Sequence, residues 1–421
     1  MCALKTGSLY ERFLSSVSRF GPFETFPVVA VAVSGGGDSL ALTFLLHQWV
    51  QGCGGKLIAL HVDHGLRPTS RHEALTLQSW LEAKGIDVHV LSWYPSLPLS
   101  NIQEKARDAR YHFLKTFCEN HHILHLFLAH HRQDQEETYF YRLSKKSGPD
   151  GLAGMAAIEE QASLRLLRPL LDFSKQELKE VLGDHPFIQD PSNINPAFWR
   201  PRFRLENAPL EAPHLKDLGI KRYQREKVLA AALGRYVCVS DWGYATLQED
   251  VPEDLKNQVW GHVLTTIGGH GYPVGSQMVT GLLKRLPVDK TTAGGCLIMK
   301  QKGSYFVTRE WGRLHVRHDL DTSDSFLWDG RFLISDIPPS FVSQGIYCAA
   351  LGEKGWRQVR NNLAVQPYSH HIYKSLPAFF NTQGEVFFLP FGDFKSPQRM
   401  VDSPKVLFLP KSRLLRSLWF I

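Results

Sequence analysis

The stretch VVAVAVSGGGDSLALTFLL, residues Val28–Leu46, decides the fold of this chain. Its apolar, β-branched start over 28–33 predicts a buried strand, and the apolar pattern over 39–50 predicts a helix. The turn between them holds three consecutive glycines, Gly35, Gly36 and Gly37. Glycines allow a sharp turn that brings backbone N–H groups and a helix N-terminus against a ligand. This order of elements is typical of a phosphate-binding loop.

The polar residues of the turn fit a bound nucleotide such as ATP. Ser34 and Ser39 provide hydroxyl groups for phosphate oxygens, and Asp38 provides a carboxylate suited to Mg²⁺. The turn is not a Walker loop, because the chain has no G-x-x-x-x-G-K-[ST]. It is not a G-x-G-x-x-G fingerprint either, because Leu40 stands at the third glycine position. A glycine-rich turn that merely ends a strand is the alternative, but the pattern S-G-G-x-D-S favours nucleotide binding.

The alternation of strand and helix continues on both sides of this turn. Strand-like apolar runs recur at 57–62, 87–91 and 123–129, and helical patterns at 9–20, 71–84 and 102–120. Such alternation predicts an α/β fold with a doubly wound parallel sheet. Ligands bind beyond the carboxyl ends of the strands in sheets of this kind. Polar motifs that directly follow the strands therefore mark the candidate site.

Length and composition indicate a globular protein of several domains. The 421 residues exceed one ordinary domain, and 43% hydrophobic with 21% charged residues is ordinary for a globular protein. We expect a catalytic domain over 1–205, a mainly helical middle domain over 206–322 and a small mixed α/β domain over 323–421. The formal charge of +7 is compatible with a polyanionic partner.

Several classes of protein are disfavoured by the sequence. The six cysteines include no C-x-x-C pair, which argues against a zinc ribbon, an iron–sulfur site and a disulfide scaffold. No apolar run approaches the roughly 18–20 residues of a membrane span, and the N-terminus lacks the features of a signal peptide. We therefore expect a cytoplasmic protein without membrane association.

Polar residues follow the second predicted strand and precede the fourth. The motif HVDHGLRP carries Asp63, His64 and Arg67 at the mouth of the same pocket as the glycine-rich turn. The motif EKARDARY carries Arg107 and Arg110, which share one helix face because they are three residues apart. We interpret these residues as part of the substrate or ATP pocket. A solvated helix face is the alternative for the two arginines.

The block LAHHRQDQEET ends the fourth predicted strand and begins a helix. Asp134 and Glu137 share one face of that helix, directed toward the same pocket mouth as His130. The nearby histidines match no zinc spacing, and His125 within the strand fits a core histidine. Three more motifs follow in order: SGPDGLAGM (147–155), RPLLDFSKQEL (168–178) and QDPSNINPAFWRPRFR (189–204). For the DPSN segment of the last motif, a plain turn is the alternative.

The ordered set resembles the tRNA(Ile)-lysidine synthetases, a family of PP-loop enzymes, over residues 20–205. ALGEKGWRQVR (350–360) and SLPAFFNTQGEVFFLP (375–390) resemble the last domain of the family's long form. The chain departs from the family pattern at Gln133 and Asn195, where aspartates are usual. It also departs at Lys146, within a segment that is usually R-G-S-G, and at Pro201, within a segment that is usually Arg-Asn-Arg.

The resemblance implies a two-step reaction. ATP adenylates the oxygen on carbon 2 of the wobble cytidine of a tRNA(Ile) with a CAU anticodon, and pyrophosphate leaves. The amine of free L-lysine then attacks that carbon and expels AMP. Mg²⁺ on Asp38 would neutralise charge on the pyrophosphate, and Arg110 would stabilise developing negative charge. His130 would help to deprotonate the lysine amine.

Substrate contacts follow from the same resemblance and from residue type. Asp134 and Glu137 suit the ammonium groups of lysine, and the alternative is that they only favour a helix N-terminus. Basic residues expected to contact tRNA are Arg200, Arg202, Arg204, Lys221, Arg222, Arg225 and Lys227. The oligomeric state stays open, with a homodimer as one option. Two other functions stay open: a PP-loop tRNA thiolation enzyme, and a non-catalytic nucleotide- and RNA-binding protein.

Overall fold

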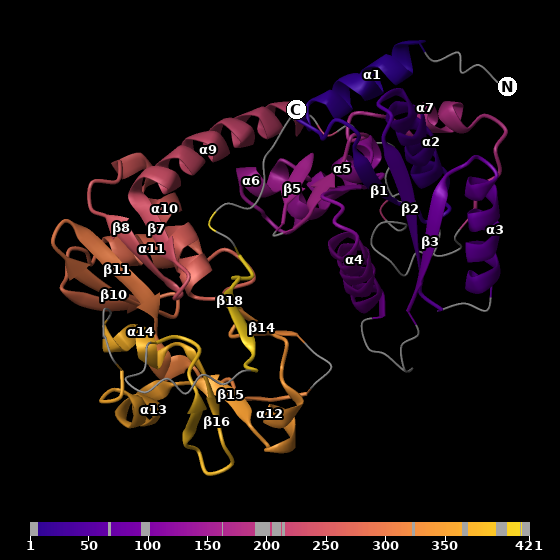
Figure 1. Cartoon of the computed structure of the whole chain (residues 1–421). Helices are drawn as coiled ribbons and strands as arrows, with labels where there is room; N and C mark the ends of the chain where they lie inside the picture. The colour runs from indigo at the N-terminus through magenta and orange to yellow at the C-terminus, as the bar shows by residue number, and fades with distance from the viewer. Residues whose placement is uncertain are drawn as a thin grey trace. The chain divides into compact units, whose positions relative to one another are not determined.

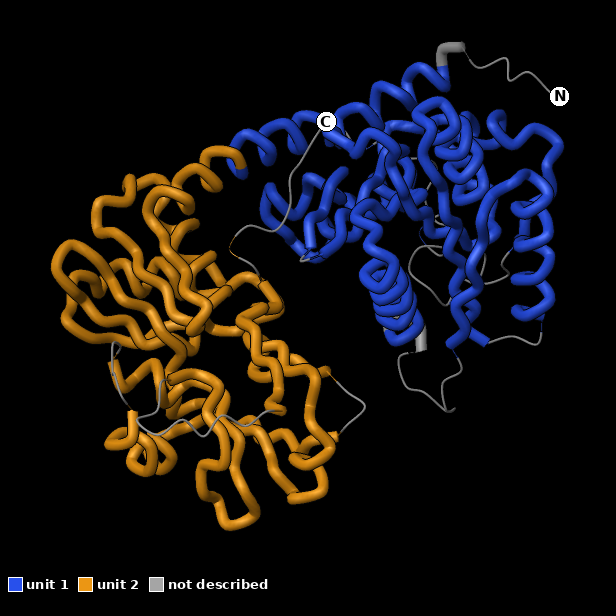
Figure 2. Tube along the Cα trace, viewed as in Figure 1, with its two compact units in different colours: residues 1–226, 417–421 blue, residues 227–416 orange. Residues whose placement is uncertain are grey.

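The computed structural model describes residues 7–65, 69–93, 102–161, 163–189, 203, 212, 215–321, 325–363, 369–392, 402–412 and 414. The chain divides into two compact units, residues 1–226 with 417–421 and residues 227–416 (Figure 2). The predicted domain boundaries at 205 and 322 lie outside the described residues. None of the described helices combines the length and the apolar character that crossing a lipid bilayer requires.

The first unit is built on a six-stranded sheet in the order β3-β2-β1-β4-β6-β5 (Figure 1). Its strands are β1 (Val28–Ala32), β2 (Lys56–Asp63), β3 (Asp87–Ser92), β4 (His125–Phe127), β5 (Ile158–Glu160) and β6 (Arg165–Leu167). Its helices are α1 (Gly7–Ser18), α2 (Gly37–Gly52), α3 (Ser70–Glu82), α4 (Ile102–Asn120), α5 (Arg132–Ser144), α6 (Pro149–Leu152) and α7 (Lys175–Leu182). Only β5 runs antiparallel to its neighbour. The predicted α/β fold with a parallel sheet is confirmed.

The central strand β1 is buried on both faces of the sheet. Val29 and Val31 pack in one core with side chains of α1, α2, α3 and α7. Ala30 points the other way and joins a second core that contains Leu114 and Cys118 of α4. Successive side chains of a strand point to opposite faces, so a strand covered on both faces needs a continuous apolar run. This explains the sequence VVAVA at the centre of the sheet.

The order of the strands reverses at β1. From β1 the chain builds outward through β2 to β3, and then returns through α4 to place β4 on the other side of β1. The parallel register pairs Val29 with His125 and Val31 with Phe127. The carboxyl ends of β1 and β4 are therefore adjacent, and the loops that follow them diverge there. A crevice at such a reversal is the usual ligand site of a doubly wound sheet.

The second unit contains antiparallel sheets. Helix α9 (Leu215–Tyr236) leads into a five-stranded sheet of order β7-β8-β11-β10-β9. Its strands are β7 (Val237–Ser240), β8 (Tyr244–Gln248), β9 (Lys290–Ala293), β10 (Cys296–Gln301) and β11 (Ser304–Arg309), with helices α10 (Glu253–Ile267) and α11 (Ser276–Leu283). The segment predicted to be mainly helical thus also contains a sheet of five strands.

Two smaller sheets complete the second unit. The first has the order β12-β15-β16-β17, with β12 (His318–Asp319), β15 (Tyr347–Ala350), β16 (Pro377–Phe380) and β17 (Val386–Phe388). The second has the order β13-β14-β18, with β13 (Phe326–Trp328), β14 (Phe332–Ser335) and β18 (Lys405–Phe408). The short helices of this region are α12 (Pro339–Ser343), α13 (Gly352–Val359) and α14 (His370–Lys374).

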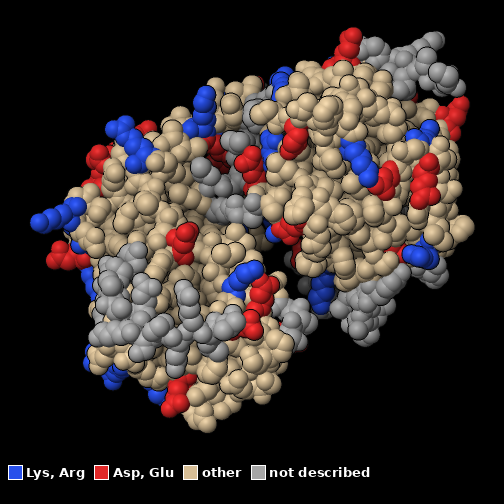
Figure 3. Space-filling model, in the orientation of Figure 1, with Lys and Arg blue, Asp and Glu red and all other residues tan. Residues whose placement is uncertain are grey.

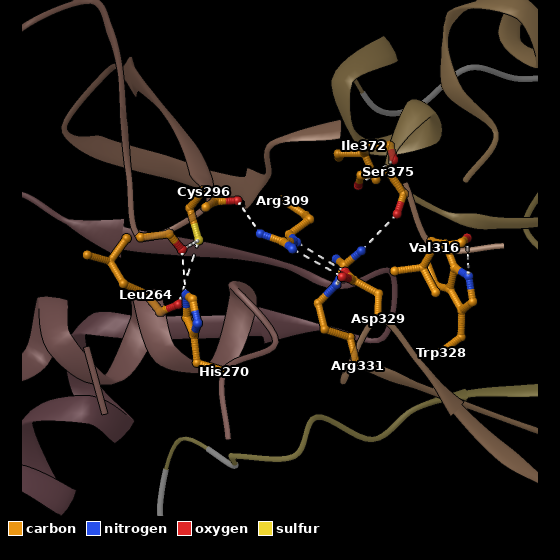
Figure 4. A network of polar contacts seen from close by, with 12 residues as sticks. Leu264, His270, Cys296, Arg309, Val316, Trp328, Asp329, Arg331, Ile372 and Ser375 are labelled. Atoms are coloured by element: carbon orange, nitrogen blue, oxygen red, sulfur yellow. Dashed lines mark hydrogen bonds and ion pairs between the residues drawn. The ribbon is translucent and has the colours of Figure 1, made fainter. Parts of the chain in front are cut away.

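A buried ionic network joins the five-stranded sheet to these smaller sheets. Arg309 of β11 and Arg331, which precedes β14, both point to the carboxylate of Asp329 (Figure 4). The Asp329 oxygens accept from Arg309 at 3.1 Å and from Arg331 Nε at 2.7 Å. Arg331 is fully buried and also donates to the carbonyl oxygen of Ser375 at 2.9 Å. One buried carboxylate therefore balances two guanidinium groups.

We predict that Asp329→Asn strongly destabilises the second unit. The amide carries no charge, so the buried guanidinium of Arg331 and the partly buried one of Arg309 lose their counter-ion, at a cost of about 3–5 kcal/mol in the free energy of unfolding. The matched control is Asp319→Asn, because Asp319 pairs with Arg317 at 2.9 Å on the exposed surface. That change should cost about 0–1 kcal/mol. Urea unfolding of both variants measures the difference, and equal losses would contradict this account of the network.

Candidate active site

The glycine-rich loop between β1 and α2 is held by its own two serines. Ser39 Oγ donates to the carbonyl oxygen of Gly36 at 2.8 Å and accepts from the backbone N–H of Ser34 at 3.2 Å. Gly35 has φ +86°, and a Cβ there would lie 2.6 Å from Ile188 Cδ1. Glycine at this position is thus required both by the backbone conformation and by the close neighbour. The loop is preorganised before any ligand binds.

Asp38 lies in the first turn of α2, directly after the loop. Helix α2 begins at Gly37, so its unpaired N–H groups and the positive end of its dipole are located at the loop. The Asp38 side chain is 32% exposed, and its Oδ2 lies 3.4 Å from Nε2 of His131. The loop, the helix N-terminus and one accessible carboxylate together can bind a nucleotide phosphate and its cation.

His131 occupies the junction between β4 and α5. Its backbone N–H donates to Asp134 Oδ2 at 3.1 Å, and its ring Nε2 lies 3.7 Å from the same oxygen. The ring is almost fully buried. Burial by itself lowers the pKa of His131, but the hydrogen bond to Asp38 and the charges of Asp134 and Asp38 outweigh it and raise the pKa overall. Sequence analysis favoured His130, yet the ring that contacts Asp38 is that of His131.

The two carboxylates of α5 have different surroundings. Asp134 accepts the N–H that precedes the helix, so it does support the helix N-terminus. Glu137 lies one turn further along the helix and is buried, with 4% exposure. A helix dipole does not account for a buried carboxylate beyond the first turn. The fold thus brings three residues into contact: Asp38, His131 and Asp134. Glu137 lies on the same face of α5, one turn after Asp134.

The motif after β2 carries two histidines held in the neutral state. His61 Nδ1 donates to the carbonyl oxygen of Val33 at 2.9 Å, and burial lowers the pKa of His61. His64 Nε2 lies 3.4 Å from Nε and 3.3 Å from Nη2 of Arg110, and it must be the acceptor because a guanidinium only donates. Burial, with the positive charge of Arg110, lowers the pKa of His64 to about 4.

Asp63 ends β2 with one oxygen available to a ligand. Its Oδ1 accepts from the backbone N–H of Gly65 at 3.0 Å. Its Oδ2 is buried and has no hydrogen-bond partner within the described part of the chain. A buried carboxylate oxygen without a partner costs free energy, so a substrate donor at this place would stabilise it.

Other predicted residues lie elsewhere or outside the described ranges. Arg107 is exposed and lies over the ring of Tyr111, 5.1 Å from its centroid, on the same helix. His125 is buried in β4, where its Nε2 lies 3.2 Å from Glu24 Oε2, as expected for a core histidine. The residues outside the described ranges are Arg67, Arg200, Arg202 and Arg204.

The basic residues of α9 divide into two kinds. Arg225 pairs with Asp150 of α6, and Arg222 donates to Glu226 at 2.7 Å and to the carbonyl oxygen of Asp150 at 3.0 Å. Lys221 and Lys227 are exposed. On the face shown in Figure 3, Lys and Arg side chains are interspersed with Asp and Glu. Part of the expected tRNA-binding charge is therefore used to hold α9 against α6.

Sequence analysis missed two supporting residues of α5. Buried Gln135 donates to the carbonyl oxygen of Met155 at 2.9 Å and accepts from its N–H at 2.6 Å. Gln133 Oε1 accepts from the backbone N–H of Lys175 at 3.1 Å, at the start of α7. Both lie in the LAHHRQDQEET block, and their contacts join α5 to the GLAGM and FSKQEL motifs, which no local sequence pattern indicated.

The residues present fit a magnesium ion that a nucleotide brings with it. Within the described ranges, no group of three or more His, Cys, Asp or Glu side chains could hold a metal ion alone. Mg²⁺ commonly takes one or two carboxylates and completes its shell with water and substrate phosphates. Asp38, beside the phosphate loop, suits that mode of binding.

Comparisons with known proteins agree on one family. The PP-loop domain family matches residues 9–211. A tRNA(Ile)-lysidine synthase from a Bradyrhizobium species is 34% identical over 300 residues, which cover 65% of this chain and 83% of that protein. A tRNA(Ile)-lysidine synthase from Orientia tsutsugamushi is 28% identical over 443 residues and covers 97% and 98% of the two chains.

Among solved structures, a U34-tRNA thiolase from Methanococcus maripaludis is 15% identical with a TM-score of 0.38, covering 53% of this chain and 72% of the thiolase. The two sequence relatives agree with the family resemblance of the ordered motifs. This chain belongs to the tRNA(Ile)-lysidine synthase family.

Proposed function

We propose that this protein is a ligase that joins free L-lysine to carbon 2 of the wobble cytidine of a CAU-anticodon tRNA(Ile), using ATP. The products are lysidine in the tRNA, AMP and pyrophosphate. The observation that carries this proposal is the contact between the two halves of the site. The phosphate loop ends in Asp38, and Asp38 lies beside His131 of the block that carries Asp134 and Glu137. A nucleotide and an ammonium substrate can thus bind side by side.

The first step suits the phosphate loop and Arg110. The cytidine oxygen attacks the α-phosphorus of ATP, the bond to the β-phosphate oxygen breaks, and pyrophosphate leaves. Mg²⁺ held by Asp38 and phosphate oxygens would supply charge neutralisation. The loop N–H groups orient the phosphates. Arg110 can offer two parallel donors to phosphate oxygens, and neutral His64 holds its guanidinium without competing charge.

The second step needs a neutral amine. The side-chain amine of free lysine has a pKa of about 10.4, so roughly one molecule in two thousand is nucleophilic in neutral water. Asp134 and Glu137 offer acceptors for the ammonium groups of lysine in a partly buried place. His130 remains the proposed proton acceptor. The amine forms a bond to carbon 2 of the cytidine, and the bond from that carbon to the adenylated oxygen breaks as AMP leaves.

A thiolation function is less well supported. Sulfur transfer by a cysteine requires a thiolate. Burial raises the pKa of Cys118 and that of Cys296 to about 12, so these two of the six cysteines stay protonated at neutral pH, and the sequence contains no C-x-x-C pair. Incubation with a CAU-anticodon tRNA, ATP, Mg²⁺ and labelled lysine, followed by nucleoside analysis, tests the proposed function. We expect labelled lysidine. A requirement for a sulfur donor would favour thiolation, and no pyrophosphate release would indicate a non-catalytic binder.

We predict that Asp38→Asn abolishes pyrophosphate release while the protein stays folded. An amide ligates Mg²⁺ poorly, whereas the partly exposed position tolerates the change. The matched control is Asp87→Asn, because Asp87 begins β3 at the opposite edge of the same sheet and pairs with Lys56 there. That control should release pyrophosphate at the wild-type rate. Near-normal release by folded Asp38→Asn protein would refute the assigned role.

We predict that Asp134→Asn and Glu137→Gln each raise the lysine requirement. One charge-assisted hydrogen bond contributes about 1.5–3 kcal/mol, so its loss should raise the KM for lysine about ten- to a hundred-fold. The Asn side chain can still accept the His131 N–H, so the melting temperature should change little. Glu136→Gln, next along the same helix, is the control. Unchanged lysine dependence with a lower melting temperature would indicate a purely structural role.

A further inference from the structure

His131 lies where the two halves of the proposed site meet. Its ring Nε2 is 3.4 Å from Asp38 Oδ2, which belongs to the phosphate-loop half, and 3.7 Å from Asp134 Oδ2, which belongs to the lysine half. Its backbone N–H also donates to Asp134 at 3.1 Å. One buried residue thus contacts both carboxylates, one on α2 and the other on α5.

The position of His131 is fixed by the fold. The residue follows β4, whose register with β1 is set by three consecutive pairs that begin at Val29 and His125. It adopts an extended backbone conformation directly before α5, and its carbonyl oxygen accepts from the N–H of Gln135 at 3.2 Å. The ring itself is almost fully buried, so it stays beside both carboxylates. A charge that binds at one carboxylate therefore acts on a ring that the other carboxylate also contacts.

The chemistry of this contact is that of a donor between two anions. Two carboxylates that approach each other repel, and a donor between them offsets that repulsion. A cation that binds at Asp38, or an ammonium group that binds at Asp134, changes the net charge around the His131 ring. The other carboxylate contacts the same ring, so its electrostatic environment changes as well. A buried contact transmits such a change because the local dielectric constant is low.

We propose that His131 is a positioning residue that couples nucleotide binding at the phosphate loop to lysine binding on α5. This inference rests on the proposed function and adds an energetic link between its two substrates. Coupling between two sites is reciprocal, so ATP should strengthen lysine binding by the same factor by which lysine strengthens ATP binding. Coupling of this kind typically amounts to about 5- to 150-fold. The size of this common factor, unlike the overall stability of the fold, is a property that a merely structural residue would not control.

The experiment is calorimetric titration of the full chain with L-lysine, with and without a non-hydrolysable ATP analogue and Mg²⁺, and the reverse titration. In the wild type we expect each ligand to strengthen the other by one common factor of at least about five. His131→Leu and His131→Phe remove the ring donor with two different shapes. In both, the factor should fall to about one, while each ligand alone still binds. His131→Gln keeps an N–H donor and should retain part of the coupling.

The matched control is His125→Gln. His125 is another buried histidine beside a carboxylate, but it lies at the amino end of β4, away from the carboxyl ends of the strands where the proposed site lies. This variant should keep the wild-type factor even when its melting temperature falls. Wild-type coupling in a donor-free His131 variant would overturn the inference, as would equal loss in His125→Gln. Wild-type protein that forms no lysidine would instead refute the proposed function.

Discussion

The parallel pairing of β1 with both β2 and β4 is the constraint on which the site depends. Because β4 returns to the far side of β1, the loop after β1 and the helix start after β4 leave the sheet at neighbouring strand ends. The apolar residues of β1 stabilise this arrangement through burial on both faces, in two separate cores. Two segments almost a hundred residues apart in sequence are thereby held against each other, at Asp38 and His131.

Charge is divided across the candidate site, and the pKa values of two histidines reflect this division. His64, beside Arg110, has its pKa lowered to about 4, whereas His131, between two carboxylates, has its pKa raised. Burial lowers the pKa of both rings; the charge of Arg110 adds to that effect at His64, whereas the two carboxylates outweigh it at His131. The Arg110 side suits phosphate oxygens, and the Asp38 and Asp134 side suits Mg²⁺ and ammonium groups. ATP and lysine carry opposite charges, so a site that binds both benefits from such a division.

The first unit could be predicted where it depends on strong local sequence patterns. It could not be predicted where it depends on contacts between residues that are far apart in the sequence. The apolar strands, the helices between them and the glycine-rich loop follow from residue type and period. The contact of His131 with Asp38 depends on the extended backbone before α5, which the sequence does not reveal. Arg225 pairs with Asp150, 75 residues earlier, so its side chain looked free for tRNA. Strands such as β9, KTTA, lack the apolar run that marks β1, and the middle segment looked mainly helical.

The central claim is that one site, at the carboxyl ends of β1 and β4, binds both ATP and lysine. The most direct measurement is a crystal structure of the protein with a non-hydrolysable ATP analogue, Mg²⁺ and L-lysine. We expect the triphosphate against the N–H groups of residues 35–39, Mg²⁺ on Asp38, and a lysine ammonium group within hydrogen-bond distance of Asp134 or Glu137. Lysine bound away from α5, or a nucleotide bound away from the loop, would contradict the account.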